Sequence, residues 1–107
     1  MKHFVVRNME AKRPVEGVEM RVIPGEKMTM VFFQLAPGAE IPEHAHPHEQ
    51  MGTVLEGSIE LVVAGESKTI HEGEAYHVLP NLPHSGKCGP SPAEIIEVFS
   101  PAREEYH

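Results

Sequence analysis

Apolar and polar residues alternate over many short stretches of the chain, which is the pattern of strands with one buried face. The longest stretch, Met28 to Ala36, ends at the turn pair Pro37-Gly38. The same pattern, bounded by turn residues, predicts further strands over residues 4–7, 18–23, 52–55, 58–64, 68–71, 75–79 and 94–99. Gly65-Glu66 suits a type II′ hairpin turn. About nine short strands and no sustained helical period predict an all-β sandwich or barrel.

The length of 107 residues suits one domain, which we expect to span residues 1–107. Ten Pro and nine Gly are spread between the apolar runs, as expected for many strands joined by turns. The polar end, residues 100–107, is predicted to be a solvated tail, with a single turn of helix as the alternative.

The charge of the chain excludes several classes of partner. The net charge of -7 arises from sixteen Glu and no Asp, so no basic surface is available for nucleic acid. The apolar run Phe4 to Val6 is far too short for a signal peptide or a membrane span. The single cysteine, Cys88, fits a reducing compartment and is predicted to be a small buried residue. We therefore expect a cytoplasmic protein with no membrane partner.

Candidate chemistry is concentrated in the segment His44-Ala45-His46-Pro47-His48-Glu49-Gln50. Residues two apart on a strand share a face, so His44 and His46 can converge on one metal ion. The same parity includes His48 and Gln50, but a straight strand carries them about 13 to 20 Å from His44. Pro47 provides a reason for a bend. Geometry alone leaves open whether His48 or Gln50 returns to the ion.

The spacing of these residues resembles that of the cupin family. The residues that carry the resemblance are Gly38, His44, His46, Gln50 and Gly57 for a first motif, and Gly73, Leu79, Asn81 and His84 for a second. Gln50 stands where the family usually has Glu, and Asn81, which tolerates positive φ, stands for Gly. The resemblance implies a double-stranded β-helix, or jelly-roll, barrel. It also implies one divalent transition metal, among Zn, Mn, Ni, Fe, Co and Cu, held by His44, His46, Gln50 and His84. His48 then lies beside the ligands.

The neutral side chain of Gln50 leaves the full charge of the metal uncompensated. We expect such a site to attract an anionic, carboxylate-bearing small molecule and to acidify bound water. Replacing Gln50 by Glu should weaken the binding of a carboxylate at fixed metal occupancy.

A second resemblance concerns residues 97–106, which are similar to the C-terminus of small cupins of pectin and alginate degradation. Those proteins convert 4,5-unsaturated monouronates to open-chain keto sugars. The resemblance implies that Glu97, Phe99 and Arg103 face the pocket, although the subgroup usually has Asp at the position of Glu97. A carboxylate there can move protons, and Arg103 can bind a substrate carboxylate. The alternative is that Phe99 is core, Glu97 a partly buried polar residue and Arg103 a surface residue.

Two other functions stay open. A metal-dependent dioxygenase would need iron, copper or nickel and an apolar pocket, which the six Met and four Phe can line. A non-catalytic module would bind a small molecule or metal without turnover. Cupins of this size are commonly homodimers that exchange an N-terminal strand, so we expect a homodimer. His71 and His77 are predicted to lie on the strand surface, and His3 and His107 are given no role.

Overall fold

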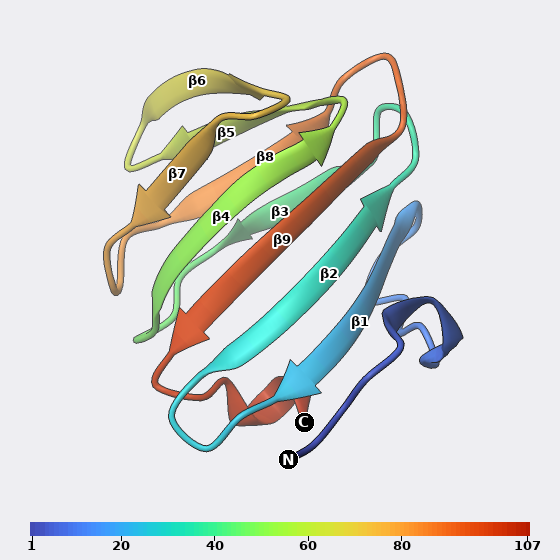
Figure 1. Ribbon diagram of the computed structural model, residues 1–107. Helices are drawn as coiled ribbons and strands as arrows, with labels where there is room; N and C mark the ends of the chain where they lie inside the picture. Colours follow the sequence, from blue (N-terminus) through green and yellow to red (C-terminus); the bar gives the residue numbers. More distant parts are fainter.

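Two antiparallel sheets face each other in the computed structural model, which describes residues 1–107 (Figure 1). The larger sheet has the strand order β1-β2-β9-β4-β7 and the smaller one β3-β8-β5-β6. The strands are β1 (Val18–Pro24), β2 (Thr29–Leu35), β3 (Glu40–His44), β4 (Glu49–Glu56), β5 (Ser58–Val63), β6 (Glu66–His71), β7 (Ala75–Val78), β8 (His84–Cys88) and β9 (Ala93–Ser100). Two short 3₁₀ helices flank them, η1 (Val6–Asn8) and η2 (Glu104–Tyr106). This is the jelly-roll barrel expected from the sequence.

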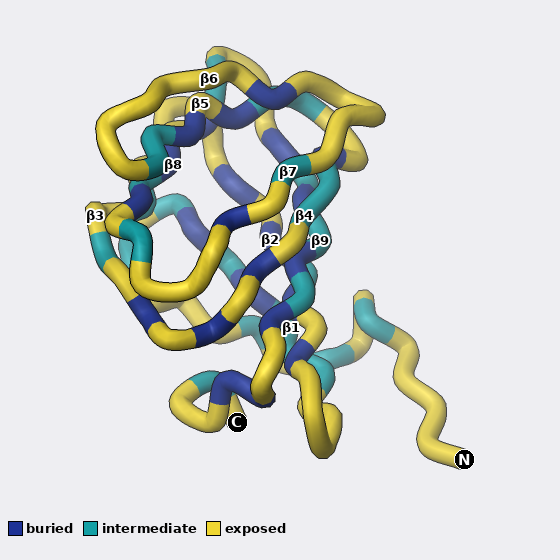
Figure 2. Tube along the Cα trace, turned by 90° about the vertical axis from the view of Figure 1, so that its left-hand side faces the viewer, coloured by how far each residue is buried: buried dark blue, intermediate teal, exposed yellow.

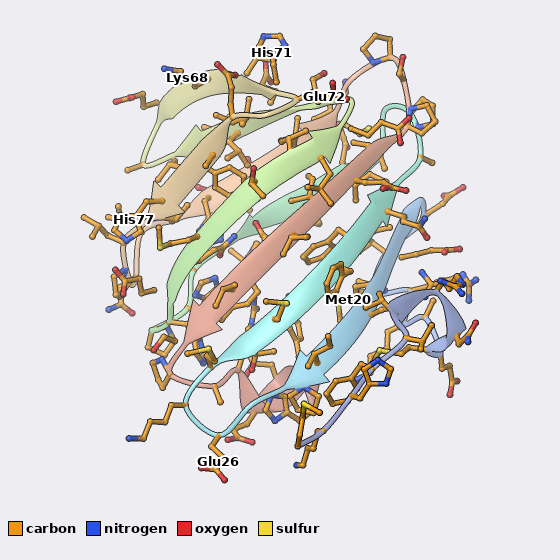
Figure 3. All side chains as sticks on the ribbon, in the orientation of Figure 1. Met20, Glu26, Lys68, His71, Glu72 and His77 are labelled. Carbon is orange, nitrogen blue, oxygen red and sulfur yellow. The ribbon has the colours of Figure 1, made fainter.

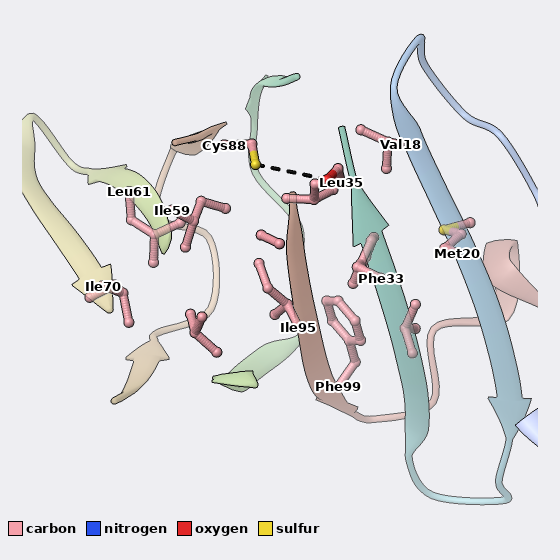
Figure 4. Packing of buried hydrophobic residues seen from close by; sticks show 13 residues of the cluster. Val18, Met20, Phe33, Leu35, Ile59, Leu61, Ile70, Cys88, Ile95 and Phe99 are labelled. Atoms are coloured by element: carbon pink, nitrogen blue, oxygen red, sulfur yellow. Dashed lines mark hydrogen bonds between the residues drawn. The ribbon is translucent and has the colours of Figure 1, made fainter. Parts of the chain in front are cut away.

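The strict alternation of β2 and β9, which pair side by side in the larger sheet, gives each of these strands one buried face. In β2, Val31 and Phe33 are buried while Met30 faces outward. Buried and exposed positions therefore alternate along these strands (Figure 2). The close view shows buried hydrophobic residues of both sheets packed between them (Figure 4). Cys88 lies in this core, as predicted, and its thiol contacts the carbonyl oxygen of Leu35 at 3.9 Å.

Glu97 is the exception to the apolar interior of β9. The strand buries alternate residues from Ala93 to Phe99, and Glu97 occupies one of these inward positions at 9% exposure. A carboxylate in the middle of an apolar strand needs hydrogen-bond donors around it. Its presence locates the polar part of the barrel interior.

The hairpin between β5 and β6 turns one residue earlier than predicted. Val63 pairs with Glu66, so Ala64 and Gly65 form the two-residue loop. Both have positive φ, 48° and 82°, which is the signature of a type I′ turn and not of the type II′ turn expected at Gly65-Glu66. The adjacent right-handed strand twist favours this geometry.

One predicted strand is absent from the structure, and two strands of the structure were not predicted. Residues 4–7 form no strand: no neighbouring strand offers them a ladder, and the chain turns into η1 instead. The strands β3 and β8 were not predicted, because β3 contains Pro42 and β8 reads His-Ser-Gly-Lys-Cys, neither of which has a clear apolar alternation.

The C-terminal segment folds back under the open end of the barrel, near the end of β1 and the start of β2 (Figure 1). Ala102 and Arg103 are buried, and the Arg103 backbone N–H donates to Thr29 Oγ1 at 2.8 Å. Lys12 donates to the carbonyl oxygen of Tyr106. The prediction of a solvated tail was therefore wrong, and the helical-turn alternative is confirmed by η2.

Candidate metal centre and its cavity

Three of the predicted ligands, His44, His46 and His84, meet at one point of the barrel. His44 ends β3 and is the cross-strand partner of His84, which begins β8. His46 lies just beyond β3, in the bend that contains Pro47 and leads to the other sheet, so it does not share a strand face with His44 as the sequence suggested. The nearest ring nitrogens of the three residues all lie within 4.8 Å of one another. The tertiary fold therefore brings His84 next to His44 and His46, which lie about forty residues earlier in the sequence.

Each of the three rings is oriented by a backbone carbonyl. The Nδ1 atoms of His44, His46 and His84 lie 2.8, 3.1 and 2.9 Å from the carbonyl oxygens of Pro42, His48 and Leu82. A carbonyl oxygen only accepts, so Nδ1 carries the proton in each ring and Nε2 presents its lone pair. Oriented rings with free Nε2 lone pairs are what a transition metal requires.

Gln50, the residue predicted as the fourth ligand, approaches the three histidines from the opposite sheet. Its Oε1 lies 3.0 Å from Nε2 of His46, which places two acceptors against each other. Burial, followed by the charges of Arg103 and His84, lowers the pKa of His46 to about 4, so a proton does not bridge them at neutral pH. Two donors bound to one ion at right angles, at bond lengths of about 2.1 Å, lie about 3 Å apart. A metal ion fits between these atoms.

The Nε2 atom of His84 gives a second, independent indication. This atom is buried and has no hydrogen-bond partner. An unpaired buried polar atom destabilises the fold through its lost hydration unless a ligand binds to it. Burial also lowers the pKa of His84, so the ring stays neutral. The residues present therefore fit a divalent transition metal, in a set of three imidazoles and one amide oxygen.

His48, the other candidate for the fourth ligand, is buried beside His46, with ring centroids 5.4 Å apart. It does not belong to the group of converging ring nitrogens. The bend at Pro47 turns Gln50 towards the cluster, which supports Gln50 over His48 at this position.

Glu97 is joined to this centre through Gln50. The amide Nε2 of Gln50 donates to Glu97 Oε2 at 2.6 Å, and the hydroxyl of Tyr76 donates to the same oxygen. Burial raises the pKa of Glu97, while the two hydrogen bonds and the charge of Arg103 oppose that rise. Burial, and then the Glu97 charge, raise the pKa of Tyr76 well above its usual value, so the phenol keeps its proton. Tyr76 was missed by the sequence reasoning, although it faces inward with Val78.

Arg103 lies in an aromatic cage at the C-terminal end. Its guanidinium carbon is 4.1 Å from the ring centre of Tyr106 and 5.0 Å from that of Phe99. Its Nε donates to Glu105 at 2.7 Å, and this hydrogen bond lowers the pKa of Glu105. Arg103 is 9% exposed, so the alternative of a surface arginine is wrong. Tyr106 is a second residue that the sequence reasoning missed.

Phe99 is fully buried in the core and also lines the cavity, so both predictions for it hold, and its ring lies edge-to-face with the ring of His46 at 5.7 Å between centres. It therefore packs between the metal centre and Arg103. His71 and His77 project from the outside of the barrel, as predicted (Figure 3). His77 contacts Glu49 at 2.7 Å.

A cavity of about 320 Å³ connects these groups. Its polar wall includes His44, Gln50, His84, Glu97 and Arg103, and the rest is mainly apolar. The apolar lining comes from both sheets and includes Val18, Phe33, Ile59, Leu61 and Ile95. A volume of this size suits one small molecule with a charged or polar end at the histidines.

Known proteins resemble the chain in sequence and in structure. The profile of the cupin domain family (Cupin_2) matches residues 31–99. The pectin degradation protein KdgF of Dickeya dadantii is 30% identical over 93 residues, which cover 85% of this chain and 84% of that protein. The transcriptional regulator PuuR of Escherichia coli is 33% identical over 75 residues, covering 65% of this chain and 40% of the regulator. An RmlC-like cupin from Shewanella frigidimarina superimposes with a TM-score of 0.91 at 29% identity, covering 100% and 97% of the two chains.

Proposed function

Since the chain belongs to the cupin family, we propose that it is a metal-dependent enzyme that converts a small anionic sugar acid, a 4,5-unsaturated uronate, to its open-chain keto form. The observation that carries the proposal is the placement of a buried carboxylate, Glu97, and a buried guanidinium, Arg103, on the wall of the same cavity as the histidine cluster. The likeness to a pectin degradation protein supports the choice of substrate.

The metal would be held by His44, His46, Gln50 and His84, and would supply a positive charge that polarises substrate oxygens. The neutral Gln50 adds no charge of its own to offset it. The site therefore favours an anion over a neutral sugar.

Arg103 is placed to bind the carboxylate of the substrate. Its Nε is engaged by Glu105, which leaves the two terminal amino groups available for a bidentate pair with a carboxylate. The rings of Tyr106 and Phe99 restrict the guanidinium to one plane. Such a restricted donor loses little freedom when the substrate binds.

Glu97 is placed to move the proton. Conversion of an enol to a ketone takes a proton from oxygen and returns one to carbon, and a single carboxylate can do both in turn. Because burial raises the pKa of Glu97, its carboxylate is a stronger base than that of an exposed Glu. Phe99 packs against the neighbouring groups and keeps that part of the wall free of water.

The test uses purified protein with its metal content measured by elemental analysis. Addition of a 4,5-unsaturated monouronate should be followed by loss of absorbance at the double bond, and removal of metal by a chelator should stop it. Arg103→Ala should abolish turnover or raise the substrate KM, while His77→Ala, at an exposed histidine, serves as the control. Turnover that is equal in the Arg103→Ala variant and the wild type would reject the proposal.

A metal-dependent dioxygenase is the second candidate, favoured by the apolar part of the cavity lining. That lining contains Phe33 and Phe99 but no Met, so the methionine contribution considered from the sequence is not present. Oxygen consumption with an aromatic or diketone substrate, in protein loaded with iron, copper or nickel, separates this function from the first.

A non-catalytic binding module is the third candidate. The likeness to part of PuuR supports it, because that protein is a transcriptional regulator. Tight binding of a uronate without any loss of its double-bond absorbance would favour this candidate.

We also propose that the protein is a homodimer. The outer face of the larger sheet exposes Met30, Met51 and Leu55, and the N-terminal residues Phe4 and Val5 are likewise exposed. Burial of these side chains against a second copy removes apolar surface from water. Met51→Glu should yield a monomer in sedimentation experiments, and a wild-type monomer would contradict the dimer.

Neither of the two helices has the length and apolar character that a membrane-spanning helix needs. The cytoplasmic location stays a prediction.

A further inference from the structure

Tyr76, Gly52 and Glu97 form one row across three neighbouring strands. Gly52 of β4 is the cross-strand partner of Tyr76 in β7 and of Glu97 in β9. Directly opposed residues share a face of the sheet, so all three positions face the barrel interior. Tyr76 reaches Glu97 only by passing over the strand that lies between them.

Gly52 makes that passage possible. A Cβ atom at residue 52 would lie 2.5 Å from both Cζ and the hydroxyl oxygen of Tyr76, closer than real Cβ atoms approach other atoms. The phenol ring therefore occupies the space that any other residue at position 52 would fill. A glycine inside a strand weakens the strand, so its presence here fits a required close approach.

The hydroxyl of Tyr76 and the amide of Gln50 both donate to one oxygen of Glu97, Oε2. The other oxygen, Oε1, accepts no hydrogen bond from the protein, and Glu97 lines the cavity. Two donors on one oxygen fix the plane and the rotation of the carboxylate. The arrangement separates an anchored oxygen from one that is open to a ligand.

We propose that Tyr76, packed over Gly52, is the positioning residue that fixes Glu97 so that Oε1 presents to the substrate. The inference rests on the proposed function, in which Glu97 moves the proton. Oε1 accepts the proton from the substrate hydroxyl and later gives it to the substrate carbon, so the carboxylate ends the cycle as it began. The proton of Tyr76 stays on its phenol oxygen throughout.

Tyr76→Phe removes the hydroxyl and keeps the ring. We expect kcat to fall about ten- to a hundredfold, because a carboxylate displaced by about 1 Å loses that much in a proton-transfer step. The substrate KM should change less than about threefold, because Arg103 and the metal are untouched. Thr53→Ala is the control: it alters the next residue of β4, whose hydroxyl bonds to the carbonyl oxygen of Glu74 and has no role in Glu97 placement.

Gly52→Ala should displace the phenol and lower kcat to a similar extent. In the double variant Gly52→Ala/Tyr76→Phe the Cβ atom still meets Cζ of the ring, but both changes remove the same hydrogen bond to Glu97. Its loss of kcat should therefore be smaller than the product of the two single losses. Full additivity of the two losses, or a wild-type kcat in Tyr76→Phe, would overturn the proposal. If Gly52→Ala does not fold, the kcat of Tyr76→Phe relative to wild type still tests the positioning role of Tyr76.

A readout without turnover distinguishes this inference from the function on which it rests. The ultraviolet resonance Raman difference between wild type and Tyr76→Phe isolates the Tyr76 phenol, and should show a strong hydrogen-bond donor that weakens in Gly52→Ala. Absence of that donor signature contradicts the positioning role even if the uronate is converted. A wild type that leaves the uronate unchanged contradicts the proposed function, and a strong donor signature then still supports the fixed carboxylate.

Discussion

Replacement of Gln50 by Glu tests how the centre is built. The amide of Gln50 donates to Glu97 at 2.6 Å while its oxygen faces His46, so a carboxylate at this position puts two acids against each other. Loss of a hydrogen bond to a charged group costs about 1.5 to 3 kcal/mol. Repulsion between the two acids adds to this, but it is limited because the pair can take up a proton.

The upper limit on this repulsion is the free energy needed to protonate one of the two carboxylates. It follows from the ordinary pKa of Glu, about 4.3, at about 1.4 kcal/mol for each pH unit above that pKa. Holding one extra proton in the folded metal-free protein at pH 7 costs at most about 4 kcal/mol, and at pH 5 about 1 kcal/mol. In the Gln50→Glu variant, the pKa of the pair formed by residue 50 and Glu97 is higher in the folded than in the unfolded protein. The contribution of this pair to the free energy of unfolding is therefore present at low pH and lost as the pH rises. We expect a deficit in the free energy of unfolding of about 2 to 4 kcal/mol at pH 7 that shrinks towards pH 5.

Urea unfolding of chelator-treated protein at pH 5 and pH 7 measures this deficit. Gln50→Leu is the matched control, because it removes the donor without adding a charge, and its deficit should change little between the two pH values. A Gln50→Glu deficit below about 1 kcal/mol at pH 7, or one as large at pH 5 as at pH 7, would refute the contact between residue 50 and Glu97. In metal-loaded protein the same variant should bind a carboxylate ligand more weakly at equal metal occupancy, and unchanged affinity would reject the role of Gln50 neutrality.

Further predictions concern the histidines and Arg103. His84→Ala should lose bound metal after saturation and desalting, as measured by elemental analysis, while His77→Ala keeps it; equal metal content would remove His84 from the ligand set. The pKa of His46 is lowered to about 4 in the fold, so its contribution to metal-free stability is present above about 6.5 and lost as the pH falls towards 4. The difference in urea midpoint between wild type and His46→Gln should show this slope, and a flat difference contradicts it. Arg103→Ala should raise the Kd of a saturated uronate about ten- to a hundredfold in calorimetry, with Arg103→Lys in between; an unchanged Kd would exclude a carboxylate contact.

The sequence by itself determined the class of fold and predicted the residue types of the candidate centre. Alternation with period two in β2 and β9 is a local property of the chain, and it follows directly from which side chains must avoid water. The spacing of the His44 segment and of His84 was equally readable, through a resemblance whose motifs carry the metal chemistry. The neutrality of Gln50 and its expected consequence for anions also came from the sequence.

Only the tertiary structure decided the partners of these residues. Whether Gln50 or His48 lies at the histidines depends on how the chain bends between two sheets, and Pro47 permits that bend without fixing its direction. The contact of Tyr76 with Glu97 joins positions 21 residues apart over a third strand, so no local pattern contains it. The burial of Arg103 depends on a tail whose composition is that of a solvated terminus. Such contacts are set by strand register and by packing across the barrel, which are properties of the whole chain.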